Sequence, residues 1–133
     1  MTGVQTCALP ILIKGLAPGP VTFETTIAGA ASPGASALVK LTYEPTTGAL
    51  RYDATASGLA TADRVLALTV QRSIDQKAGP IVAHILAPNQ LSGSGTLTMR
   101  GRDREDLVAG TLYLHFYTRQ APLGVGRTRL ALP

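Results

Sequence analysis

Apolar and polar side chains alternate along several short stretches of this chain, as they do in a β-strand that buries one face and exposes the other. The clearest stretch is residues 107–132. In its first half Leu114 and Phe116 lie on one side of the alternation, and His115 and Tyr117 lie on the other. The stretch therefore predicts a final hairpin with an apolar face for the core and a polar face turned away from it.

Short runs of the same kind recur along the chain, with Gly, Pro or Ser turns between them. The pattern predicts strands at residues 21–29, 37–44, 49–57, 64–72, 81–87 and 96–100, followed by the two strands of the final hairpin. Loops are predicted at residues 73–80 and 92–95, and one helical turn at residues 103–109. Seven to eight strands without a long helix predict an all-β, antiparallel β-sandwich of Greek-key, immunoglobulin-like or superoxide-dismutase-like type.

The first eleven residues are expected to lie outside this fold. Residues 1–11, MTGVQTCALPI, resemble the translation of a sequencing-library adapter, whose reverse complement encodes the same peptide from a GTG start codon. This segment contains Cys7, the sole cysteine, so no disulfide is predicted in the remainder. We expect residues 12–133 to form one domain, truncated at its N-terminus as in a fragmentary metagenomic sequence.

The composition favours an extracytoplasmic protein. Charged residues make up 15% of the chain and hydrophobic residues 45%, so Thr, Ser, Gly and Ala must form much of the surface. No apolar run approaches the length of about 18 residues that marks a membrane span. We therefore expect a secreted or periplasmic protein without a membrane span.

The net charge of +4 does not predict a nucleic-acid partner. Arg100, Arg102 and Arg104 form the densest basic group, but Asp103 interrupts it and two further acidic residues follow. Nucleic-acid binding would require clustered basic residues interleaved with aromatic ones. The group instead predicts a solvated turn with local ion pairs.

Three segments resemble the chordin-type (CHRD) domain: LTYEPTTGALRYDATASGL at residues 41–59, GPIVAHIL at residues 79–86, and LVAGTLYLHFYTRQAPLGVGRTRL at residues 107–130. The resemblance spans roughly residues 21–132 and implies an extracytoplasmic β-sandwich. The framework positions that carry it are Gly48, Leu50, Tyr52, Ser57, Gly58, Leu59, Gly79, Pro80, Gly110, Tyr113, Thr118, Pro122, Gly124 and Arg127.

The polar signature of that family is different in this chain. The two strand histidines of the family fall on Thr69 and Gln71, and its Asn-Val-His becomes residues 115–117. Its glutamate becomes Val125, and Arg127 is retained. The resemblance therefore implies a fold and leaves the activity open.

Few residues in the chain are suited to metal binding or nucleophilic catalysis. A zinc or iron site needs three or four His, Cys or carboxylate ligands, and His84 and His115 are the only histidines, so no metal or other cofactor is predicted. Ser94 lies between two glycines but lacks the strand-turn-helix context of a nucleophile elbow. It is predicted to lie in a flexible loop.

Five polar residues can share one sheet face if their strands are neighbours. These candidate ligand-binding residues are Thr69, Gln71, His115, Tyr117 and Arg127. One interpretation is a small pocket in which Arg127 holds an anion or carbonyl group and His115 transfers a proton. The other is a partly buried hydrogen-bonded patch that fixes strand register and satisfies its own donors.

Two functional hypotheses follow. The first is a non-catalytic extracytoplasmic module that binds another protein, a surface polymer or copies of itself, the last through an open strand edge. The second is a small metal-independent enzyme, such as an isomerase or cyclase, or a ligand-binding barrel that uses His115, Tyr117 and Arg127. A closed pocket lined by these three side chains would favour the second hypothesis.

Overall fold

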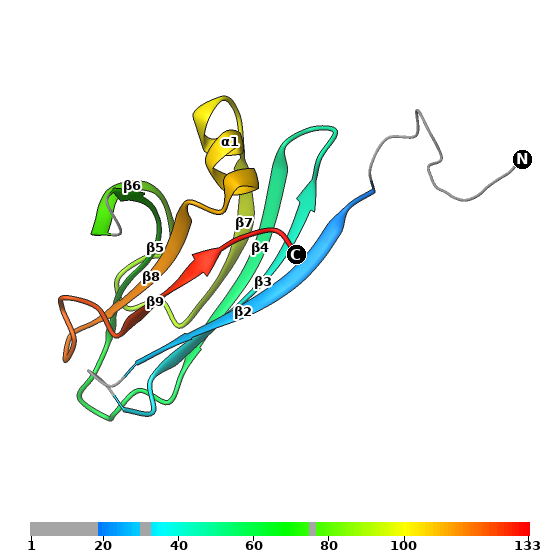
Figure 1. Cartoon of the computed structure of the whole chain (residues 1–133). Helices are drawn as coiled ribbons and strands as arrows, with labels where there is room; N and C mark the ends of the chain where they lie inside the picture. The colour runs from blue at the N-terminus through cyan, green and yellow to red at the C-terminus, as the bar shows by residue number, and fades with distance from the viewer. Residues whose placement is uncertain (1–18, 30–32, 75–76) are drawn as a thin grey trace, which may run out of the picture.

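Two antiparallel sheets of four strands each make up the fold in the computed structural model, which describes residues 19–29, 33–74 and 77–133 (Figure 1). The first sheet has the order β2-β3-β4-β7 and the second the order β6-β5-β8-β9. The first sheet consists of β2 (Val21–Ala28), β3 (Ser36–Glu44), β4 (Ala49–Ser57) and β7 (Ser92–Thr98). The second consists of β5 (Val65–Ile74), β6 (Lys77–Leu86), β8 (Leu112–Thr118) and β9 (Gly126–Leu130). The predicted all-β sandwich is confirmed, and the predicted adapter-derived segment lies outside the described residues.

The alternation in the sequence determines which face of each sheet is buried. Along β8 every second residue is buried, and Leu114 and Phe116 are fully enclosed. In the opposite sheet Val39 and Leu41 of β3 are buried in the same alternating manner. These apolar faces pack against each other and form one core, which provides the main driving force for folding.

The two sheets come together along β2 and β9, where glycines allow the backbones to approach. A Cβ atom at Gly126 would overlap the carbonyl oxygen of Ala28, and one at Gly29 would overlap that of Val125. The hydroxyl of Thr128 donates a hydrogen bond of 3.3 Å to a carbonyl of β2. Figure 1 shows β2 and β9 running close together along this side of the sandwich.

A short helix closes one end of the sandwich. Helix α1 (Arg102–Ala109) connects β7 to β8, and it ends at Gly110, whose φ of 74° is the left-handed conformation that glycine favours at helix ends. Leu107 is fully buried in the core, which fixes the helix over the end of the sheets. The helix is eight residues long, so the prediction of a single turn was too short.

The sequence predicts ion pairs between neighbouring residues around α1, but the shortest ion pairs there are made with a residue of β5. The Arg72 guanidinium on β5 bonds both Asp103 and Asp106, with 2.8 Å between Arg72 Nε and Asp106 Oδ2. The local pair, Arg102 with Asp106, is longer at 3.7 Å. The hydrogen bond that Arg72 donates to the Asp106 carboxylate is the main cause that raises the pKa of Arg72. A strand residue far away in sequence therefore anchors the helix, which local spacing could not reveal.

Both predicted loops were wrong. Strand β5 extends to Ile74 and β6 begins at Lys77, so most of residues 73–80 belongs to a bulged hairpin. Strand β7 begins at Ser92 despite its glycines. Gly95 lies opposite Tyr52 of β4, and a Cβ atom there would come within 2.7 Å of the phenol oxygen. Glycine is therefore required by packing in this strand and does not mark a loop.

The burial of Leu107 predicts a large loss of stability when its side chain is shortened. Leu107→Ala should lower the free energy of unfolding by about 2–5 kcal/mol, because it leaves a cavity at the end of the core. The neighbouring Val108 is 64% exposed, so Val108→Ala should change it by less than about 0.5 kcal/mol. Urea denaturation of both variants tests this, and equal losses would contradict the docking of α1 through Leu107.

Candidate functional site

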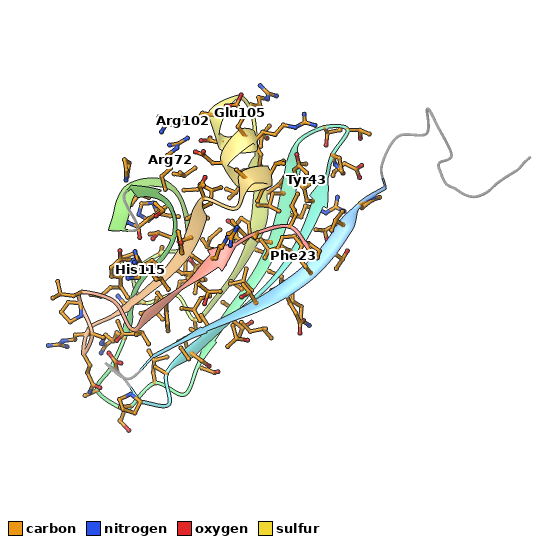
Figure 2. All side chains as sticks on the ribbon, in the orientation of Figure 1. Phe23, Tyr43, Arg72, Arg102, Glu105 and His115 are labelled. Carbon is orange, nitrogen blue, oxygen red and sulfur yellow. The ribbon has the colours of Figure 1, made fainter. Side chains whose placement is uncertain are left out.

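Four of the five predicted site residues meet on the outer face of the second sheet. Strands β5 and β8 are direct neighbours, with Thr69 opposite His115. Gln71 lies two residues along β5, and Tyr117 lies two residues along β8, so all four side chains point away from the core. Figure 2 shows the position of His115 on β8, at the side of the sheet that is turned away from β2. We call Thr69, Gln71, His115 and Tyr117 the Gln71 cluster.

The side-chain amide of Gln71 is the centre of this cluster. Its oxygen accepts hydrogen bonds from the Tyr117 hydroxyl at 2.9 Å and from the Thr69 hydroxyl at 3.2 Å, and it lies 3.0 Å from His115 Nδ1. Its nitrogen donates to the backbone carbonyl of Gly79 on β6 at 3.2 Å. Thr69 and Gln71 are buried although they lie on the outer face. The amide thus connects three strands of the sheet.

The bond to Gly79 determines which nitrogen of His115 carries the proton. If the amide of Gln71 were turned over, its oxygen would face the carbonyl oxygen of Gly79, and two acceptors would repel each other. The amide oxygen therefore faces His115, and an attractive contact between this oxygen and Nδ1 requires a proton on Nδ1. The Tyr117 hydroxyl also lies 3.0 Å from Nδ1, and because it donates its proton to the amide oxygen, its own oxygen can accept from Nδ1 in the same arrangement. In the neutral ring Nε2 is then the basic nitrogen.

The basic nitrogen of His115 is covered by the loop between β8 and β9. A Cβ atom at Gly124 would overlap His115 Nε2, so the backbone of Gly124 lies directly against the ring. Gly124 has a φ of 122°, a conformation that other residues rarely adopt. The rings of His115 and Tyr117 are stacked with 4.3 Å between their centroids. The imidazole is therefore held on three sides by Gln71, Tyr117 and Gly124.

Partial burial of His115 favours its neutral form. Burial is the main cause that lowers the pKa of His115 from its ordinary value of 6.5, and the positive charge of Arg127 lowers it further. A neutral imidazole with Nδ1 protonated is the form that the Gln71 cluster accommodates. Protonation of His115 would place a positive charge on the ring beside the positive charge of Arg127.

The fifth predicted residue, Arg127, lies on the same outer face, on β9. It is opposite His115 in the pairing of β8 with β9, and its guanidinium carbon lies 5.3 Å from the centroid of the Tyr113 ring. Tyr113 was predicted as a framework position and not as a site residue, although its alternation with His115 places it on this face. The contacts of Gly79 and Gly124 with this cluster were not predicted, because no periodic pattern reveals them.

Other potential sites are sparse in the part of the chain that the structure describes. No group of three or more His, Cys, Asp or Glu side chains is close enough there to hold a metal ion. Two shallow hollows are lined by described residues, one around Asp63, Arg64 and Asn89 and one around Lys40 and Asp53. Neither includes a residue of the Gln71 cluster. Among the described residues, no helix is long and apolar enough to cross a membrane.

The lowered pKa of His115 predicts a specific pH dependence of stability. The unfolded chain takes up a proton near pH 6.5, but the folded chain does so only at lower pH, so acidification favours unfolding. The free energy of unfolding should fall between about pH 7.5 and the lowered pKa, and then level off as far as this group is concerned. The measurement is chemical denaturation at a series of pH values above the range where carboxylates titrate.

Matched histidine variants isolate this effect. His115→Gln should reduce the fall in stability between about pH 7.5 and 5.5, because it removes the titrating group. His84→Gln, at an exposed position on β6, is the matched control substitution. Identical pH profiles for wild type and His115→Gln would contradict the burial of a neutral imidazole.

In comparisons with known proteins, no family model, no curated protein and no solved structure matches the chain. The similarity to the CHRD domain thus rests on the framework residues of the sequence alone. What the outer face of the second sheet does has to be inferred from its own contacts.

Proposed function

We propose that this chain is a non-catalytic, extracytoplasmic β-sandwich module that acts by contact with another protein, a surface polymer or copies of itself. The Gln71 cluster is the observation that carries the proposal. Its donors and acceptors are directed at one another, and the basic nitrogen of His115 lies under Gly124. A general base must reach the proton that it removes, and this nitrogen faces the protein's own backbone.

The interior and the outer face of the first sheet also support the proposal. Buried apolar side chains from both sheets, such as Phe116 and Leu41, pack the space between them, whereas a ligand-binding barrel would need an open cavity there. The outer face of the first sheet is rich in hydroxyl groups, with Thr22 and Thr42 bonded to each other at 3.3 Å. Exposed hydroxyls on the outer face of a sheet suit contact with a polymer or another protein surface.

The extracytoplasmic part of the proposal rests on composition and resemblance. Only 15% of the residues are charged, and the exposed positions of the edge strand β7 are all Ser or Thr. The framework similarity to CHRD domains points the same way. The competing proposal, an enzyme or ligand carrier that uses His115, Tyr117 and Arg127, would require Gly124 to move away from the imidazole.

Binding to insoluble polymers separates these two proposals. Purified protein should co-sediment with at least one of cellulose, chitin and peptidoglycan, and His115→Gln should bind equally well because the Gln71 cluster is structural. Thr26→Glu/Thr55→Glu places charge on the outer face of the first sheet and should weaken the binding by about tenfold, or about 1.4 kcal/mol. Loss of binding in His115→Gln at unchanged melting temperature, with full binding by the double variant, would overturn the proposal.

A further inference from the structure

The edge strand β7 has a backbone that is open to pairing. Leu91 O accepts a hydrogen bond from Ala56 N, and Met99 N donates one to Gly48 O, both at 2.7 Å. In an antiparallel ladder successive residues direct their backbone groups to alternate sides, so odd-numbered residues of β7 face β4 and even-numbered residues face outward. The outward N–H and C=O groups belong to Ser92, Ser94, Thr96 and Thr98. Within the described part of the chain these groups have no hydrogen-bond partner.

Unlike most natural edge strands, β7 carries none of the usual protections against pairing. Its sequence, SGSGTLT, contains no charged residue and no proline, and its ladder with β4 shows no bulge. The other edge of the same sheet, β2, lies against β9. The outward residues of β7 are all exposed, and β6 shares no ladder with β7. None of the described residues therefore occupies this edge, and we take it as open to another strand.

From these features we infer that β7 pairs antiparallel with β7 of a second copy of this chain, so that the two first sheets form one continuous sheet of eight strands across a twofold axis at Gly95. The inference rests on the proposed contact function and names its partner. In this register Ser92 lies opposite Thr98 of the second copy, and Ser94 lies opposite Thr96. Each such pair exchanges two backbone hydrogen bonds, so every outward group on both strands is satisfied.

Side-chain size also fits this register. On the inner face Gly93 lies opposite Leu97 of the second copy, so the larger side chain meets the residue without one. On the outer face every pair joins a Ser to a Thr, and both can form hydrogen bonds across strands. A pairing of identical patches of this kind is the usual arrangement in a twofold dimer.

At low salt, where charges this far apart are little screened, charges on β4 favour this register over its neighbours. Arg51 lies beside Thr96, and Asp53 lies beside Ser94, all on the outer face. With Ser94 opposite Thr96 of the second copy, each Asp53 shares a row with Arg51 of the other copy, about 14 Å away across three strand spacings. A shift of two residues in one direction puts Asp53 in line with Asp53, and the opposite shift puts Arg51 in line with Arg51. Opposite charges therefore face each other only in the proposed register.

Removing one outward backbone donor tests the edge pairing. Thr96→Pro deletes an N–H that β4 does not use, so the sandwich should still form, which circular dichroism and urea denaturation can verify. Wild type should show a concentration-dependent monomer–dimer equilibrium in sedimentation velocity between micromolar and millimolar protein. The dimer dissociation constant should rise by more than about tenfold in folded Thr96→Pro. A wild type that stays monomeric, or a dimer that Thr96→Pro leaves intact, would overturn the inference.

A charge exchange tests the register itself. In about 10 mM salt, where the Debye length is about 30 Å, Arg51→Glu makes like charges face each other and should raise the dissociation constant by about threefold, whereas Arg51→Glu/Asp53→Arg should return it to the wild-type value. Lys40→Glu, a charge change on the same face but farther from β7, should have little effect. Failure of the double variant to restore dimerisation would reject this register. A monomer that still binds a polymer through the outer face would reject edge pairing and leave the proposed contact function standing.

Discussion

The amide of Gln71 imposes the constraint on which the outer face of the second sheet depends. It is buried in the middle of β5, so its oxygen and its nitrogen must both find partners away from water. The nitrogen bonds the Gly79 carbonyl on β6, and the oxygen bonds the hydroxyl of Tyr117 on β8. Because the ladder between β5 and β6 is interrupted by register shifts, this side-chain bridge helps to hold β6 against the sheet.

The outer faces of the two sheets differ in how their polar groups are bonded. In the second sheet the polar side chains of the Gln71 cluster bond to one another, and the loop at Gly124 covers the imidazole of His115. In the first sheet the outer face carries exposed hydroxyls, and the edge at β7 leaves backbone groups without partners in the described chain. The polar side chains of the second sheet are thus bonded to one another, and we propose that the first sheet provides the surface for contact.

The sequence predicts the architecture well because alternation reports burial directly, as in β8, where every second residue is enclosed. It also places His115 and Tyr117 on one face with Gln71, because residues that pair across neighbouring strands point to the same side of the sheet. It fails where a contact is not periodic. The bond from Gln71 to Gly79 and the ion pair of Arg72 with α1 depend on how strands and helix meet in space. It fails also for β7, where glycine is needed by packing against Tyr52.

The protonation site of His115 at neutral pH tests the structural role of the Gln71 cluster most directly. Long-range nitrogen–proton NMR correlations distinguish the two neutral forms of the imidazole ring. A structural cluster held by Gln71 requires the proton on Nδ1, with Nε2 unprotonated beneath Gly124. A ring that carries its proton on Nε2, or one that is charged at neutral pH, would contradict this account.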